Sequence, residues 1–251
     1  MNQELTAIVP LESDPDVFTN FARSLGLKST YSFIDIYSIS DETLLSFIQR
    51  PVVAIVLLMP VSSARRHLPV PAIPERHRDK PIWLQQKFTN ACGLYALLHI
   101  LSNFQSLLCT GSKLSNFIER CCHEQREKAT DLSTEINAEL DQFIVDFVRG
   151  YPDDFLNASG TATAAPKPED VVDLHYITFI SHDKALWELD GRASVGGPIY
   201  LGESTQQLEG EYMDIINEPI VKRRIESYME SVESEVDKLK FSLIGLARTN
   251  E

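Results

Sequence analysis

The spacing of apolar residues predicts a chain in which helices and strands are mixed. Apolar residues that recur every three or four positions are typical of amphipathic helices, and shorter alternating or continuous apolar runs are typical of strands. Helices are expected over Val17–Leu25, Asp41–Ile48, Ala91–Asn103, Lys113–Cys122, Asp131–Arg149 and Glu218–Lys238. Strands are expected over Thr6–Leu11, Tyr31–Tyr37, Val52–Met59, Asp173–Ile180, Ala185–Asp190, Pro198–Leu201 and Phe241–Ala247.

Two of these elements carry additional signals. The first helix follows Asp14, a favourable N-cap, has Pro15 near its first turn, and meets Gly26 at its end. Val52–Met59 is apolar at every position. A continuous apolar run of this kind predicts a central strand that is buried on both faces.

Two long segments show neither the helical nor the strand spacing of apolar residues. Arg65–Pro81 is basic and rich in proline, which predicts a surface loop or linker. It is short and has no interleaved aromatic residues, so nucleic-acid binding is disfavoured there. Gly150–Asp170 contains Pro, Gly and small residues and reads as one long loop. A loop of that length inside a compact domain is usually functional or disordered.

Composition limits the class of protein. The chain has 251 residues, of which 43% are hydrophobic and 24% charged, as expected for a globular protein of one large or two small domains. Its net charge of −13 argues against a nucleic-acid surface and suits a basic protein partner. Acidity is also a common aid to solubility, and that alternative stays open.

The cysteines and the apolar runs predict the compartment. The four cysteines, of which Cys121 and Cys122 are adjacent, form neither a disulfide framework nor a CxxC zinc motif. No signal peptide is visible, and the run Val52–Met59 is too short to span a bilayer. We therefore expect a cytoplasmic protein, with access to the nucleus, that has no metal, cofactor or membrane partner.

Four polar side chains together resemble the parts of a cysteine hydrolase. Cys92 is expected at a helix N-terminus, where backbone N–H groups favour a thiolate, and Gln86 lies six residues before it. His175 lies in an expected strand, and Asp190 follows it by fifteen residues. Nucleophile, base, orienting acid and oxyanion donor would all be present.

Each of these residues also has a simpler interpretation. Cys92 could be a small buried residue, Gln86 could merely cap the next helix, and His175 could be an ordinary polar strand residue. Asp190 precedes Gly191, a pair that first of all indicates a turn.

The motifs around these residues resemble the ubiquitin C-terminal hydrolase family, also known as peptidase family C12. They are Gln86-Lys87-Phe88-Thr89-Asn90-Ala91-Cys92-Gly93, Asp173-Leu174-His175-Tyr176 and Glu188-Leu189-Asp190-Gly191-Arg192. The Gln–Cys and His–Asp spacings match the family, and the resemblance covers nearly the whole chain. Cys92-Gly93-Leu94-Tyr95 and Gly197–Gly202 look most like the small, single-domain, yeast-type members.

The resemblance implies an α/β (α+β) papain-like cysteine protease fold: a central, mostly antiparallel sheet flanked by helices, with a knotted backbone. Residues 1–251 would form one catalytic domain without a C-terminal extension, and a crossover loop at about 150–170 would arch over the cleft. Cys92 would attack, His175 would be the base and Asp190 would orient it. Gln86 and the Cys92 backbone N–H would bind the oxyanion.

The resemblance also implies the substrate. The enzyme would release small adducts from the C-terminal glycine of ubiquitin, or of a close ubiquitin-like protein of the NEDD8/Rub type, through a thioester. Glu12, Asp16 and Asp35 match acidic positions that hold a basic substrate tail, although each could be a solvated surface acid. We expect a monomer. Two alternatives stay open: a ubiquitin-binding module without turnover, and a papain-fold acyltransferase.

Overall fold

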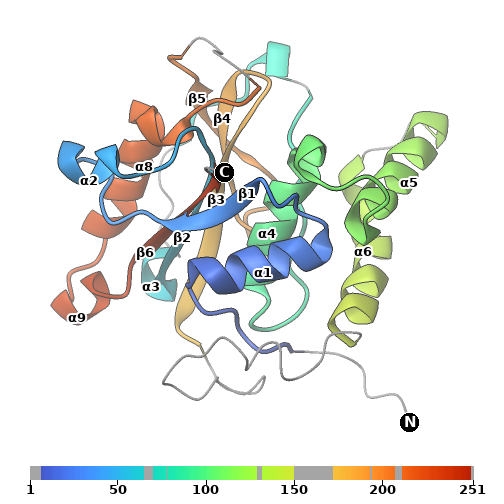
Figure 1. The fold of residues 1–251 in the computed structure, drawn as a ribbon, viewed down its shortest axis with the longest axis horizontal. Coiled ribbons are helices and arrows are strands. Elements are labelled where there is room, and N and C mark those ends of the chain that lie inside the picture. The colour runs from blue at the N-terminus through green and yellow to red at the C-terminus, as the bar shows by residue number, and fades with distance from the viewer. Residues whose placement is uncertain are drawn as a thin grey trace.

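A six-stranded sheet lies at the centre of the computed structural model, which describes residues 7–64, 70–77, 79–128, 132–149, 172–192, 194–206 and 211–249. Its strands lie in the order β1-β6-β2-β3-β4-β5, and every neighbouring pair is antiparallel (Figure 1). The strands are β1 Tyr31–Asp35, β2 Val52–Pro60, β3 Leu174–His182, β4 Ala185–Leu189, β5 Ile199–Glu203 and β6 Ser242–Arg248. The expected α/β class with an antiparallel sheet is confirmed.

Strand β2 is the buried centre that its apolar run predicts. All nine of its residues are buried. Val56 and Leu58 belong to the hydrophobic core on one face of the sheet, and Leu57 and Met59 to the core on the other face. Successive side chains of a strand point to opposite faces, so a strand covered on both sides has no polar position.

Helices cover both faces of this sheet (Figure 1). Helices α1, α4, α5 and α6 lie on one side, and α2, α8 and α9 on the other. The helices are α1 Pro15–Leu25, α2 Glu42–Ser46, α3 Val61–Ala64, α4 Cys92–Asn103, α5 Lys113–Lys128, α6 Leu132–Arg149, α8 Pro219–Glu230 and α9 Glu235–Lys238, with 3₁₀ turns at Glu75–His77, Gln105–Leu107 and Ile215–Asn217. Helix α4 packs against β3, which brings the cysteine motif close to the histidine motif.

Helix α1 begins and ends where its signals predict. The Asp14 carboxylate accepts hydrogen bonds from the backbone N–H groups of Asp16 and Val17, at 2.8 and 2.9 Å. Gly26 ends the helix with a left-handed φ of 119°, which glycine adopts without strain. Its apolar side chains, among them Phe18 and Leu25, are buried.

Two expected elements are wrong. Thr6–Leu11 does not form a strand within the described residues, because its only strand-like contact is an isolated bridge between Ala7 and Thr89. The single helix expected over Glu218–Lys238 is two helices, α8 and α9, separated at Ser231–Ser234.

The structure describes part of the segment Arg65–Pro81 and none of the segment Gly150–Asp170. Part of Arg65–Pro81 is anchored, because His77 is buried and its Nε2 lies 2.6 Å from Glu203 Oε1 on β5. Gly150–Asp170 lies outside the described residues, so the crossover loop and the knot stay predictions.

Candidate active site

Cys92 is the first residue of α4 and is half-buried. The backbone turns into the helix at Asn90, whose φ of 60° is left-handed, a conformation that asparagine tolerates better than most residues. The cap residue is Ala91, without a side-chain hydrogen bond, so the interpretation of Gln86 as a helix cap is wrong. The sulfur is therefore carried at the open N-terminal end of a buried helix.

Gly93 lets the chain before α1 approach this helix closely. A Cβ atom at Gly93 would lie 2.9 Å from Leu11 Cβ and 3.3 Å from the Tyr176 ring. Tyr176 also donates a hydrogen bond from its hydroxyl to the Leu11 carbonyl oxygen, at 3.0 Å. These contacts place residues 10–13 along one wall of the site.

His175 and Asp190 meet because β3 and β4 are antiparallel neighbours. His175 is the second residue of β3, and Asp190 directly follows β4. The His175 Nε2 lies 2.8 Å from Asp190 Oδ1, and both side chains are buried. Asp190 thus has a buried side-chain partner in addition to its place before Gly191, and its role in orienting His175 stays a prediction.

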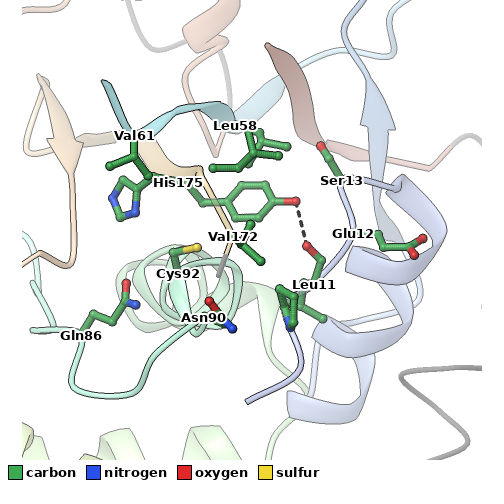
Figure 2. Close-up of a pocket in the computed structure, with 13 residues that line it drawn as sticks. Leu11, Glu12, Ser13, Leu58, Val61, Gln86, Asn90, Cys92, Val172 and His175 are labelled. Carbon is green, nitrogen blue, oxygen red and sulfur yellow. Dashed lines mark hydrogen bonds between the residues drawn. The ribbon is translucent and has the colours of Figure 1, made fainter. Parts of the chain in front are cut away.

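A cavity of about 330 Å³ lies in front of these residues and is lined by Gln86, Cys92 and His175. Figure 2 shows Gln86, Asn90 and His175 arranged around Cys92. Cys92 and His175 both line this cavity, and Cys92 is close enough to raise the pKa of the His175 ring. Since Nε2 contacts Asp190, Nδ1 is the ring nitrogen left for the sulfur. The fold thus unites residues that are 98 positions apart (190 − 92).

The charges of the site favour a protonated imidazole. Burial alone would lower the pKa of His175. Hydrogen bonds to Asp190 and Cys92, together with the charges of both groups, outweigh burial and raise this pKa to about 9. Burial would likewise raise the pKa of Asp190, but hydrogen bonds from His175 and Arg192 hold it well below its usual range. At neutral pH the pair is therefore an imidazolium beside a carboxylate.

Arg192 and Trp83 contact Asp190 directly, and His99 contacts the backbone of Leu84, the residue after Trp83; sequence reasoning assigned none of the three a role. Arg192 Nε lies 2.8 Å from Asp190 Oδ2, and its Nη2 contacts the same oxygen. Trp83 donates from Nε1 to the Asp190 carbonyl oxygen at 2.7 Å, and His99 Nε2 accepts from the Leu84 N–H at 3.0 Å. Burial lowers the pKa of His99 to about 4, so its imidazole is neutral. Of these three residues, only Arg192 could have been found from the sequence, because it stands inside the Asp-Gly-Arg motif.

Gln86 is tied to the strand end that carries Asp190. Its backbone N–H donates to the Gly191 carbonyl oxygen at 2.6 Å. Its side-chain Nε2 donates to the Phe88 carbonyl oxygen at 3.0 Å, and Oε1 is buried with no hydrogen-bond partner among the described residues. A carboxamide has two N–H bonds, so a second one remains to donate into the cavity.

The three acidic candidates are placed differently. Glu12 lines the cavity, and Figure 2 shows its carboxylate directed away from Cys92. Asp16 lies exposed in the first turn of α1, and Asp35 ends β1, where it accepts a hydrogen bond from the Tyr37 hydroxyl at 3.1 Å. The structure thus brings Glu12 to the site and leaves Asp16 and Asp35 outside the cavity lining.

The described part of the chain contains neither a metal-binding cluster nor a membrane-spanning helix. Among those residues no group of three or more His, Cys, Asp or Glu side chains is placed to hold a metal ion. No described helix is both long and apolar enough to cross a bilayer.

Comparisons with known proteins agree with this geometry. The model of the family described as "Ubiquitin carboxyl-terminal hydrolase, family 1" matches residues 8–226. The chain is 40% identical to ubiquitin carboxyl-terminal hydrolase YUH1 of Saccharomyces cerevisiae, over 98% of both chains. It is 28% identical to a probable ubiquitin carboxyl-terminal hydrolase of Dictyostelium discoideum, over 96% of this chain and 88% of that one.

A solved structure shares the fold. The Trichinella spiralis UCH37 catalytic domain bound to ubiquitin vinyl methyl ester superimposes with a TM-score of 0.56 at 19% identity. The match covers 96% of this chain and 95% of that one. At this identity the likeness concerns the fold, and it supports the expected papain-like architecture.

Proposed function

Since the chain belongs to family 1 of the ubiquitin carboxyl-terminal hydrolases, we propose that it hydrolyses bonds between the C-terminal glycine of ubiquitin and small adducts, peptides or amines. One observation carries the proposal: Cys92, His175 and Gln86 line the same cavity, and His175 Nε2 is bound to Asp190 Oδ1. A buried, oriented imidazole beside a thiol is the arrangement that activates a cysteine nucleophile.

The first half-reaction makes a thioester. The proton of the Cys92 thiol resides on His175 Nδ1, as the raised pKa of the imidazole favours, and the Cys92 sulfur attacks the carbonyl carbon of the glycine. The negative oxygen of the tetrahedral intermediate accepts hydrogen bonds from the Gln86 amide and the Cys92 backbone N–H. The intermediate then expels the amine, which takes its proton from the His175 imidazolium.

The second half-reaction restores the enzyme. His175 accepts a proton from water, and the resulting hydroxide attacks the thioester carbonyl. Collapse of the second tetrahedral intermediate breaks the carbon–sulfur bond and frees the glycine carboxylic acid, which loses its proton to solvent. The proton that His175 took from water stays with the His175–Cys92 pair. Asp190 keeps the ring oriented throughout, and Arg192 holds the Asp190 carboxylate in place.

The structure gives little support to a ubiquitin-binding module without turnover. Such a module would need a misplaced nucleophile or base, whereas His175 here shares the cavity with Cys92 and is bound to Asp190. Ubiquitin-like proteins of the NEDD8/Rub type remain proposed second substrates. Their hydrolysis would use the same residues, so only competition between the two substrates distinguishes them.

Hydrolysis of a ubiquitin–fluorophore amide tests the function. The wild-type protein should release the fluorophore, and Cys92→Ala should not, while still binding ubiquitin in a calorimetric titration. Cys109→Ser is the matched control, because Cys109 is a free, exposed thiol outside the cavity. Turnover that survives Cys92→Ala would refute the assignment of the nucleophile. Adding a free amine in excess would reveal an acyltransferase as a ubiquitin–amine product.

We further propose that the chain acts as a monomeric catalytic domain in the cytoplasm and nucleus. Cys92 and Cys109 are free thiols, and a cysteine nucleophile needs a reducing compartment to stay in that state. Light scattering of the pure protein and imaging of a tagged form would test the two statements separately.

A further inference from the structure

Lys87 follows the oxyanion candidate Gln86 directly and fastens this segment to two helices. Its backbone N–H donates to the Tyr95 hydroxyl on α4 at 3.3 Å. Its Nζ lies 2.5 Å from Asp141 Oδ2 on α6. On its other side, Gln86 is bound to the Gly191 carbonyl oxygen. The glutamine is therefore held between the end of β4 and helix α6.

The α6 end of this contact is firmly placed. Leu140 and Ile144 flank Asp141 on the helix and are buried in the main core. Asp141 Oδ1 is buried and has no hydrogen-bond partner among the described residues. Asp141 is therefore carried on a helix that is anchored in the core, and Lys87 is the cation that contacts its carboxylate.

We propose that Lys87 and Asp141 form a positioning pair that holds the Gln86 amide at the oxyanion position, so that α6 controls the rate of the chemical step. This inference rests on the proposed hydrolase function. Lys87 touches neither the substrate bond nor the reacting atoms; it acts through the backbone of its neighbour. An oxyanion donor stabilises the transition state only when it is already in place, because a mobile amide must be ordered during the reaction.

The pair contributes little to global stability, which makes the kinetic effect measurable. The Lys87 and Asp141 side chains are 40% and 32% exposed, and ion pairs at such exposure stabilise proteins weakly. Variants of either residue should therefore fold. Their kcat should fall by about three- to tenfold, a fraction of what loss of the oxyanion donor itself would cost, with KM unchanged.

Two variants of opposite charge separate positioning from a long-range field. Lys87→Met removes a positive charge, and Asp141→Asn removes a negative charge. Positioning predicts that both lower kcat. A field effect on a basic substrate predicts changes in KM of opposite sign, and that result would overturn the proposal. Glu139→Gln is the matched control on α6, since Glu139 pairs with Arg120 at 3.6 Å and not with the Gln86 segment.

A double-mutant cycle with Gln86→Ala is the decisive measurement. If Lys87 acts through Gln86, Lys87→Met should have no further effect on kcat once the glutamine amide is gone. An unchanged three- to tenfold loss in that background, or no loss in the wild-type background, would refute the pair. High salt should lower the wild-type kcat toward that of Lys87→Met, which itself should not respond, since salt screens an exposed ion pair.

These results are distinct from failure of the hydrolase function. A wild-type protein that does not hydrolyse the ubiquitin amide would refute the proposed function. A wild-type protein that does so, and is slowed by Gln86→Ala but not by Lys87→Met or Asp141→Asn, would refute the positioning pair alone.

Discussion

Asp190 must stay charged although it is 99% buried (1% exposed), and its neighbours explain how. Arg192 supplies a cation and three donors, namely its backbone N–H, Nε and Nη2, and His175 supplies the fourth donor. Burial of a carboxylate costs free energy unless such partners compensate it. The charge of Asp190 in turn helps to raise the pKa of His175 to about 9.

The pH dependence of the rate tests this coupling. Because the pKa of His175 is raised to about 9, the imidazolium is present below that pH and lost as pH rises through it. We expect kcat/KM to fall above about pH 9. Asp190→Asn removes the hydrogen bond and the charge that raise the pKa, so the alkaline limb should move to lower pH and the rate should fall steeply. An unmoved limb in the variant would show that Asp190 does not set the pKa of His175.

Gln86→Ala tests the oxyanion donor. We expect kcat to fall by about two to three orders of magnitude with little change in KM, because the donor acts mainly in the transition state. Thermal denaturation serves as the control, since Gln86 does not cap α4. Lower stability with unchanged turnover per folded molecule would contradict the assignment.

The residues that the sequence could identify are those that lie in recognisable motifs. Cys92, His175, Asp190 and Gln86 were predicted, and the structure brings them together. Trp83 and His99 could not be predicted as partners, because their contacts depend on how a segment without regular secondary structure lies between α4 and the end of β4. No local pattern in the sequence encodes that contact.

At the scale of elements, one buried ion pair joins α8 to the strand that carries Asp190. Arg224 Nε on α8 lies 2.6 Å from Glu188 Oε2 on β4, and the Tyr228 hydroxyl donates to Glu188 Oε1 at 2.7 Å. All three side chains are buried. Glu188 lies two residues before Asp190, so this cluster fixes the strand end that the Asp190 carboxylate follows.

Arg224→Met should therefore destabilise the protein. It leaves the Glu188 carboxylate buried without its cation, which typically costs about 3–5 kcal/mol. Urea unfolding measures this loss. The neighbouring Arg223→Met is the control, because Arg223 is exposed on the same helix. The double variant Arg224→Met with Glu188→Gln should recover part of the stability. Equal stability of Arg223→Met and Arg224→Met would contradict the account.

Elements with strong periodicity or caps were predicted well, and the errors have physical causes. The α8–α9 boundary contains no Gly or Pro that would indicate a break. Ser231 is the C-cap of α8, and Ser234 is the N-cap of α9. Val232 between them is buried, so packing decides the break. Thr6–Leu11 is apolar because Ile8 and Leu11 enter the core, although its described residues make only an isolated bridge and pair with no strand.

At the scale of the whole molecule, the net charge of −13 bears on how the substrate arrives. Glu12 lines the cavity, whereas Asp16, at the start of α1, and Asp35, at the end of β1, lie outside its lining. A negative surface around a cleft accelerates the approach of a basic partner. The charge should therefore affect binding and leave the chemical step unchanged.

Salt provides the test. Exposed charges are screened over about 10 Å at 0.1 M salt and over about 3 Å at 1 M. We expect kcat/KM to fall as salt rises. Because salt is also expected to lower kcat, kcat is measured at each salt concentration, and the comparison is made on KM, which should rise. Charge reversal at Glu12, Asp16 or Asp35 should raise KM at low salt and reduce the salt dependence.

Glu119→Lys on α5 makes the same change in net charge at an exposed site outside the cavity. If Glu119→Lys raises KM as much as the three reversals do, net charge alone attracts the substrate. If none of the reversals changes KM, the carboxylates take no part in recognition.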